Sequence, residues 1–123
     1  VAWVSHTSRP NHPFHAAAQR YLRCQPSVLT FGVAGGQAGA SSVLGSLKLI
    51  LLAANLGDTR SLAAHPWTTT HGRLQEPAKL KAGVRPEMIR LTVGLEDFTD
   101  LKRDLEQALA TVALEARETV VSV

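Results

Sequence analysis

The feature that most constrains the fold of this 123-residue chain is a six-residue segment in which apolar side chains alternate with others. In residues 88–93, Ile89, Leu91 and Val93 alternate with three side chains that include Arg90. Successive side chains of a β-strand point to opposite faces of the sheet, so the pattern predicts a strand with one apolar face. Arg90 is therefore expected on the face that points away from the hydrophobic core.

A long helix is predicted directly after this strand. Gly94 ends the strand pattern, and Asp97 is placed to cap a helix whose first turn also contains Asp100. The apolar positions that follow recur at helical spacing and form one stripe: Phe98, Leu101, Leu105, Ala108, Leu109 and Val112.

The amino-terminal half predicts two helices and a strand after an extended opening at residues 1–4. Asn11 or His12 can cap a short helix in which Pro13 takes the first position. Its predicted apolar face consists of Phe14, Ala17, Tyr21 and Leu22. A β-branched and aromatic segment, residues 28–33, is then predicted to be a strand. The second helix is expected from about Gln37 to near Gly57, with its apolar positions at Val43, Leu44, Leu47, Leu51 and Ala54.

Two shorter elements are predicted between these halves. Residues 61–65 form an extended candidate that ends at Pro66, and residues 77–83 form a short helix with proline first and glycine last. Few strands and several helices of this kind predict an α/β (α+β) two-layer sandwich. Its small, mostly antiparallel sheet would be covered by helices on one face.

Composition narrows the classes of protein to which the chain can belong. With 45% hydrophobic residues, 123 residues suffice for one domain with one core. The net charge of +3 comes from basic residues interleaved with acids, which argues against nucleic acid as a partner. The longest apolar stretch, residues 47–55, is far shorter than the ~20 residues of a membrane span and is interrupted by Lys48. A single cysteine forms no internal disulfide, which favours a cytoplasmic location.

Arg90 is the first candidate for a functional side chain. A guanidinium on a rigid strand can bind a carboxylate through two parallel hydrogen bonds, as the recognition of an α-amino acid requires. Ser61, at the start of a predicted strand, could donate its hydroxyl to the same carboxylate. The pattern alone favours an ordinary solvated arginine and a serine that satisfies local backbone groups.

Other polar groups are weaker candidates for a site. The glycine-rich segment, residues 32–39, matches neither a dinucleotide-binding fingerprint nor a P-loop, and it is interpreted as a tight turn between strand and helix. None of the five histidines has an acid or cysteine at ligand spacing, so no metal site is expected. For His65 and His71 we expect hydrogen bonds that order a loop. The residues by themselves therefore predict a binding surface and not a complete active site.

Four segments, read in order, resemble the Cys/Met-metabolism family of pyridoxal-phosphate enzymes, which includes homoserine-ester sulfhydrylases, cystathionine γ-synthase and carbon–sulfur lyases. The segments are NLGD (55–58), SLAAHP (61–66), TTH (69–71) and IRLTVGLED (89–97). The resemblance covers nearly the whole chain. It implies that residues 1–123 are the carboxy-terminal small domain of a larger fold-type I enzyme. The amino-terminal cofactor domain, which carries the Schiff-base lysine, would then lie outside this chain.

The resemblance also implies roles for the two candidate residues. Arg90 matches the arginine that grips the substrate α-carboxylate, and Ser61 matches a residue that assists it from the adjacent strand. No catalytic, cofactor-binding or metal-binding residue is expected in these 123 residues, and the isolated fragment is expected to be inactive. Pyridoxal 5'-phosphate would be bound mainly by the other domain. The implied assembly is a cytoplasmic homotetramer.

The segments GDTRS (57–61) and TTTHGRL (68–74) look closer to the sulfhydrylases, especially the O-succinyl type, than to the lyases. The implied reaction is γ-replacement in methionine biosynthesis or transsulfuration. The acyl group leaves the γ carbon of O-succinyl- or O-acetylhomoserine, and sulfide adds to give homocysteine. Trp67 stands where relatives have a small residue, and its indole could narrow the substrate channel.

Two alternatives stay open at this point. One is a lyase of the same family that acts on cystathionine, cysteine or methionine. The other is a stand-alone regulatory module that binds small amino acids without a cofactor.

Overall fold

The computed structural model describes residues 1–121, and the side chains of residues 1–112 within them. In chain order the elements are β1 (Trp3–Ser5), α1 (His15–Tyr21), β2 (Val28–Gly32), α2 (Gly36–Ser46), β3 (Leu51–Leu52), β4 (Leu62–Ala64), α3 (Glu76–Lys81), β5 (Met88–Thr92) and α4 (Phe98–Val121).

The strands form one five-stranded sheet in the order β1-β2-β5-β4-β3. Three of the four strand pairs are antiparallel, and only β3 runs parallel to its neighbour β4. The predicted α/β sandwich with a mostly antiparallel sheet is confirmed. β5, the strand that carries Arg90, is the central strand, which makes it the most constrained position for a functional side chain.

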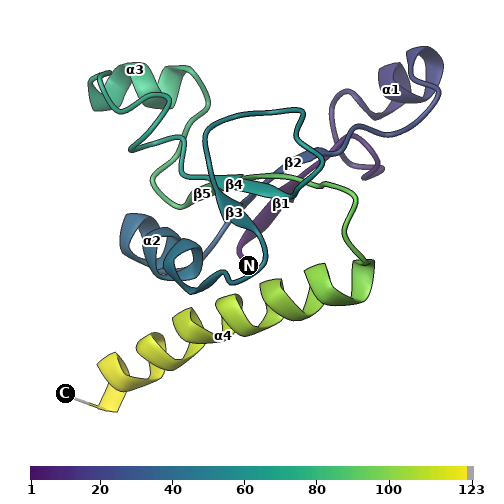
Figure 1. Ribbon diagram of the computed structural model, residues 1–123. Helices are drawn as coiled ribbons and strands as arrows, with labels where there is room; N and C mark the ends of the chain where they lie inside the picture. Colours follow the sequence, from purple (N-terminus) through teal and green to yellow (C-terminus); the bar gives the residue numbers. More distant parts are fainter. Residues whose placement is uncertain (122–123) are drawn as a thin grey trace.

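Helices α2 and α4 lie together on one face of the sheet, whereas α1 and α3 stand away from this layer (Figure 1). The core between the two layers contains Phe31 from β2, Ala63 from β4, and Ile89 and Leu91 from β5. From the helices it contains Val43, Leu44, Leu101, Ala108 and Val112. Ile89 and Leu91 are 1% and 4% exposed, so the alternation predicted for β5 is confirmed at these two residues. It does not extend to the end of the predicted strand, because Val93 lies beyond β5 and is 36% exposed, and Thr92 is buried.

The prediction for α2 was wrong at its carboxy-terminal end, because the helix ends at Ser46 and not near Gly57. Leu51 and Leu52 form strand β3 instead, where the N–H groups of Leu51 and Ala53 donate to the carbonyls of Ser61 and Ala63. The helical spacing of leucines continues through this segment. Its backbone N–H groups instead donate to the carboxylate of Asp104 on α4 and to carbonyls at strand β4.

The first helix was predicted in the right region, but its start and its orientation were wrong. α1 begins at His15 with Phe14 at its N-cap position, so neither Asn11 nor His12 caps it and Pro13 precedes it. Phe14 and Tyr21 of the predicted apolar face are 66% and 73% exposed. Ala18 is the residue of α1 that is buried. The cause is the distance of α1 from the core, since the helix packs on its own flanking loops through bonds such as His15 Nδ1 with the Thr7 carbonyl, 2.7 Å.

The remaining elements lie close to their predicted positions. β2, β4 and β5 lie within the predicted strands, and Asp97 caps α4 by accepting the Thr99 N–H at 2.7 Å. α3 contains its proline in the first turn and is followed by Gly83 at a φ of 78°. Within the part of the chain that the structure describes, no helix combines the length and apolarity that a bilayer crossing would need.

Candidate functional site

Arg90 lies on the sheet face opposite the helices, as the alternation predicted. Its neighbours across the sheet are Thr30 of β2 and Ala64 of β4. The side chain is half-buried, and its Nη2 donates to the carbonyl oxygens of Ala54, at 2.6 Å, and Asn55, at 3.3 Å. These two carbonyls, which follow β3, form a cradle that fixes the direction of the guanidinium.

The charge of Arg90 is not neutralised by this domain. Among the described residues, the ion pairs join Asp58 with Arg60, Lys102 with Glu106 and Asp100 with Arg103, and none includes Arg90. A guanidinium has five N–H donors, of which the carbonyl cradle engages those of one nitrogen. The N–H groups that remain can donate hydrogen bonds to an anion such as a carboxylate.

Ser61 is placed differently from what the resemblance implied. Its side chain is fully buried, with 0% exposure. The hydroxyl donates to Glu96 Oε2 at 2.8 Å and accepts the Gly94 N–H at 2.8 Å, while the Ser61 N–H donates to Glu96 Oε1 at 2.6 Å. Every polar group of Ser61 is therefore used inside the domain, including its carbonyl, which accepts the Leu51 N–H at 3.0 Å.

The structure does not bring Ser61 and Arg90 together. Ala64 pairs with Arg90 in the β4–β5 register, and directly paired side chains lie on the same face. Ser61 precedes Ala64 by three residues, so by alternation its side chain points to the other, helix-covered face. The Ser61 hydroxyl and the Arg90 guanidinium therefore point to opposite faces of the sheet.

Glu96 is a residue whose importance the sequence did not reveal. Its pKa is lowered chiefly by the hydrogen bond from the Ser61 N–H, against an opposing effect of burial, so the carboxylate is ionised at neutral pH. In the sequence it looked like one of several acids before α4, where the helix dipole favours negative charge. Only the antiparallel pairing of β4 with β5 shows that it faces Ser61.

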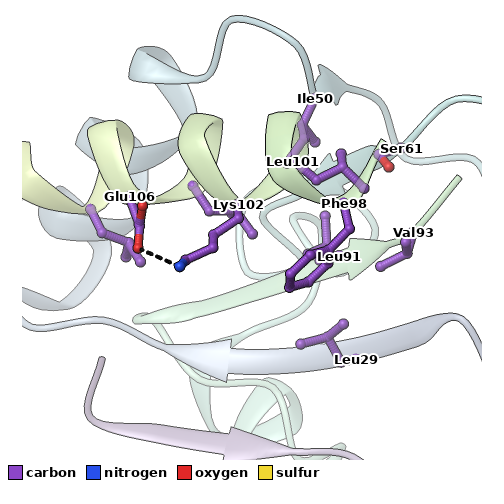
Figure 2. Close-up of a pocket in the computed structure, with 11 residues that line it drawn as sticks. Leu29, Ile50, Ser61, Leu91, Val93, Phe98, Leu101, Lys102 and Glu106 are labelled. Atoms are coloured by element: carbon purple, nitrogen blue, oxygen red, sulfur yellow. Dashed lines mark ion pairs between the residues drawn. The ribbon is translucent and has the colours of Figure 1, made fainter. Parts of the chain in front are cut away.

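An apolar groove lies between the sheet and α4 (Figure 2). It measures about 290 Å³, and the ion pair of Lys102 with Glu106, 3.7 Å, lies at its side. Leucines and other apolar side chains make up most of its wall: Leu29, Ile50, Leu91, Val93, Phe98, Leu101, Leu105 and Leu109. Ser61 also lines it, but the hydroxyl is occupied by Glu96. The one cation among the described residues that line the groove, Lys102, is paired with Glu106.

Trp67 is a packing residue in this domain. It is 9% exposed, and the ammonium of Lys79 lies 4.6 Å from the centre of its ring in a cation–π contact. This burial leaves no free indole to narrow a substrate channel. His65 orders the adjoining loop as predicted, through Thr68 Oγ1 at 2.8 Å and the Pro86 carbonyl at 2.7 Å.

The four lysines of the chain differ in their surroundings. Lys79 is buried against Trp67, and Lys102 pairs with Glu106 on the helix side. Lys48 and Lys81 are exposed. In the portion described, no group of three or more histidines, cysteines or acids is placed to hold a metal ion.

The fold and the site thus define an α/β domain that presents a cation from the open face of its sheet. The sequence profile of the Cys/Met metabolism PLP-dependent enzymes matches residues 1–110. The chain belongs to this family of pyridoxal-phosphate enzymes. The resemblance inferred from the four segments is confirmed.

Sequence relatives include sulfhydrylases from several bacteria. O-acetyl-L-homoserine sulfhydrylase 1 of Thermus thermophilus is 51% identical over 111 residues, which are 89% of this chain and 26% of that protein. O-succinylhomoserine sulfhydrylase of Pseudomonas aeruginosa is 38% identical over 109 residues, 89% of this chain and 27% of that protein. The chain thus spans about a quarter of the length of these relatives. The identities give no support to the expected leaning toward the O-succinyl type.

Solved structures of family members share the fold. A putative O-acetylhomoserine (thiol)-lyase of Campylobacter jejuni, with a pyridoxyl-lysine phosphate, has a TM-score of 0.81 at 37% identity, covering 87% of this chain and 26% of that one. A cystathionine gamma lyase of Micromonospora echinospora has a TM-score of 0.84 at 34% identity, covering 89% and 29%.

Proposed function

We propose that this chain is the carboxy-terminal domain of a pyridoxal-phosphate sulfhydrylase that makes homocysteine from O-acetylhomoserine and sulfide. In this proposal Arg90 binds the α-carboxylate of the substrate. The higher identity to the O-acetyl relative, 51% against 38% for the O-succinyl relative, supports the acetyl ester. A cytoplasmic homotetramer, in which a separate domain of the same polypeptide holds the cofactor, belongs to the same proposal.

The observation that carries the proposal is the state of Arg90. Its guanidinium is fixed on the central strand by the carbonyls of Ala54 and Asn55, but its charge has no carboxylate partner among the described residues. A cation that is held in one direction and has no counter-ion is available to an anion from elsewhere. The α-carboxylate of an amino acid has the charge and planar shape that fit the remaining donors.

The contribution of Arg90 to the reaction would be orientation and not proton transfer. An arginine stays protonated at all relevant pH values, so it cannot serve as a general base. Holding the carboxylate at a rigid point restricts the rotation of the substrate and places the α and γ carbons where the cofactor domain can act on them. The cofactor, when bound by that domain, supplies the electron sink for the chemistry.

Ser61 retains a different part in this proposal. The resemblance predicts that it assists the carboxylate, but its hydroxyl is occupied by Glu96 and it lies on the opposite face from Arg90. In this proposal Ser61 therefore assists indirectly, by fixing where the strands around Arg90 lie.

The test uses the intact parent enzyme loaded with its cofactor. Supplied with sulfide and O-acetylhomoserine, it should form homocysteine, and Arg90→Ala should lower kcat/KM by about 10²-fold, the loss of a charged hydrogen-bonded pair of roughly 3 kcal/mol. The absorbance of the bound cofactor should be unchanged, because Arg90 does not hold it. An unchanged kcat/KM in Arg90→Ala, or a loss of the cofactor absorbance in that variant, would contradict the assignment.

A carbon–sulfur lyase is the second candidate, favoured by the TM-score of 0.84 with the cystathionine gamma lyase. It predicts ammonia and a 2-oxo acid from thioether substrates, with no homocysteine from sulfide. The same assay therefore distinguishes the two activities.

A further inference from the structure

Ser61, Gly94 and Glu96 form a connected group that we call the β4–β5 lock. Glu96 accepts both the N–H and the hydroxyl of Ser61, and the Ser61 hydroxyl in turn accepts the Gly94 N–H. The lock joins the residue before β4 to the residues after β5. Three hydrogen bonds, two of them to a carboxylate, make it one of the strongest polar contacts between these two strands.

The lock also fixes β3. The Ser61 carbonyl accepts the N–H of Leu51, the first residue of β3, and the next bond of the ladder joins the Ala53 N–H to the Ala63 carbonyl. The chain then continues directly into Ala54 and Asn55. A shift of Ser61 would therefore move β3 and the carbonyl cradle that follows it.

The position of Arg90 depends on the lock in two ways. Its backbone lies on β5, which the lock holds at Gly94 and Glu96, and its guanidinium is held by carbonyls that follow β3, which the lock holds at Ser61. The direction of the guanidinium is thus set by the placement of β3 and β4 relative to β5.

We propose that Ser61 and Glu96 are positioning residues for Arg90, acting through the strands and without touching the substrate. The inference rests on the proposed role of Arg90 as the carboxylate clamp. It assigns a function to Glu96 and explains how Ser61 can matter for substrate binding from the opposite face of the sheet. A misplaced guanidinium would hold the substrate carboxylate less tightly, which raises KM.

The experiment is a double-mutant cycle in the intact, cofactor-loaded enzyme. Ser61→Ala and the milder Glu96→Gln should each raise KM for the amino-acid substrate about tenfold while kcat changes by less than about twofold. In an Arg90→Ala background the same substitutions should change KM by less than about twofold, because residues that act through one group are not additive. Val112→Ala, which removes buried methyl groups of α4 far along the helix, is the control. It should lower the melting temperature and leave KM unchanged.

Four results would overturn the inference. An unchanged KM in both single variants, or a full additional increase in the Arg90→Ala background, would show that the lock does not act through Arg90. An equal increase of KM in Val112→Ala would show a general effect of stability. An unchanged KM in Arg90→Ala would refute the proposed carboxylate clamp, and with it this inference. The cycle therefore distinguishes a failure of the clamp from a failure of the lock.

Discussion

At the residue scale, Gly94 shows why one position of the site admits a single amino acid. A Cβ at this position would lie 2.4 Å from the Thr59 carbonyl oxygen, 2.5 Å from the Arg60 carbonyl carbon and 2.6 Å from the Ser61 nitrogen. All three are backbone atoms, so no side-chain rotation can relieve the contact. The absence of a side chain at Gly94 is what allows the Ser61 hydroxyl to reach its N–H at 2.8 Å.

Gly94→Ala is therefore expected to destabilise the domain by roughly 2–4 kcal/mol, because the strands must separate to admit the methyl group. Thermal unfolding of the 123-residue chain measures the effect. The matched control is Gly45→Ala in α2, where an added Cβ would have no neighbour within 4 Å. There alanine should raise stability by up to about 1 kcal/mol, since it favours the helix. Similar melting temperatures for the two variants would refute the close approach at Gly94.

The placement of Arg90 could be predicted from residues alone, but that of Ser61 could not. Alternation within one strand determines which side chains share a face, and it assigned Arg90 correctly. For Ser61 the sequence predicted a hydrogen bond to the substrate carboxylate or to local backbone groups, because its partner Glu96 lies 35 residues further along the chain. Contacts of this length depend on the register between strands, which a single sequence does not encode locally.

At the element scale, the boundary between α2 and β3 depends on Asp104 of α4. Its carboxylate is 5% exposed and accepts the N–H groups of Lys48 at 2.8 Å, Leu49 at 2.9 Å and Ile50 at 2.9 Å. Three successive amides bound in this way cannot donate to the carbonyls of a continuing helix. Helical periodicity predicted the long helix α4. The same periodicity predicted α2 to be too long, because Asp104, the residue that ends it, lies more than fifty residues away in the sequence.

The pKa of Asp104 reflects the balance of these contacts. Burial acts to raise the pKa, but the hydrogen bonds from Ile50, Lys48, Leu49 and Gln107 outweigh it and lower the pKa below its usual value. A carboxyl group whose pKa is lower in the folded state binds its proton more readily when the chain is unfolded. Its stabilising contribution is complete above the unfolded pKa and is lost as the pH falls through the folded pKa.

Asp104→Asn should accordingly lower the free energy of unfolding by roughly 2–3 kcal/mol at neutral pH, because an amide cannot accept all the hydrogen bonds that the carboxylate accepts. The difference from the unmodified chain should stay constant down to pH ~5 and shrink below pH ~4. Denaturant unfolding at several pH values measures it. Glu106→Gln on the exposed side of α4 is the control, with an expected change below about 0.5 kcal/mol. A difference that persists undiminished to pH ~2 would contradict the role of the carboxylate.

At the scale of the whole molecule, the two faces of the sheet have different surroundings. The helix-covered face contains the core and the apolar groove beside α4, where Phe98 remains 77% exposed. The open face carries Arg90 and its carbonyl cradle. The sequence predicted this division, because apolar and polar side chains alternate in β5.

The division also bears on the alternative of a stand-alone module that binds amino acids. Recognition of a free amino acid needs a partner for the ammonium group as well as for the carboxylate. The described residues place no acid beside Arg90, and the apolar groove lies on the opposite face of the sheet. A chain that spans about a quarter of its relatives therefore fits better as one wall of a site that another domain completes.

The most direct test of the central claim removes Arg90 from the enzyme and the α-carboxylate from the substrate, separately and together. In the intact enzyme, kcat/KM is measured for O-acetylhomoserine and for its analogue in which the α-carboxylate is a neutral amide, with Arg90 and with Arg90→Ala. The account predicts that removing the carboxylate costs the unmodified enzyme about 10²-fold and costs the Arg90→Ala enzyme less than about threefold. An equal loss in both enzymes would show that Arg90 does not bind the carboxylate.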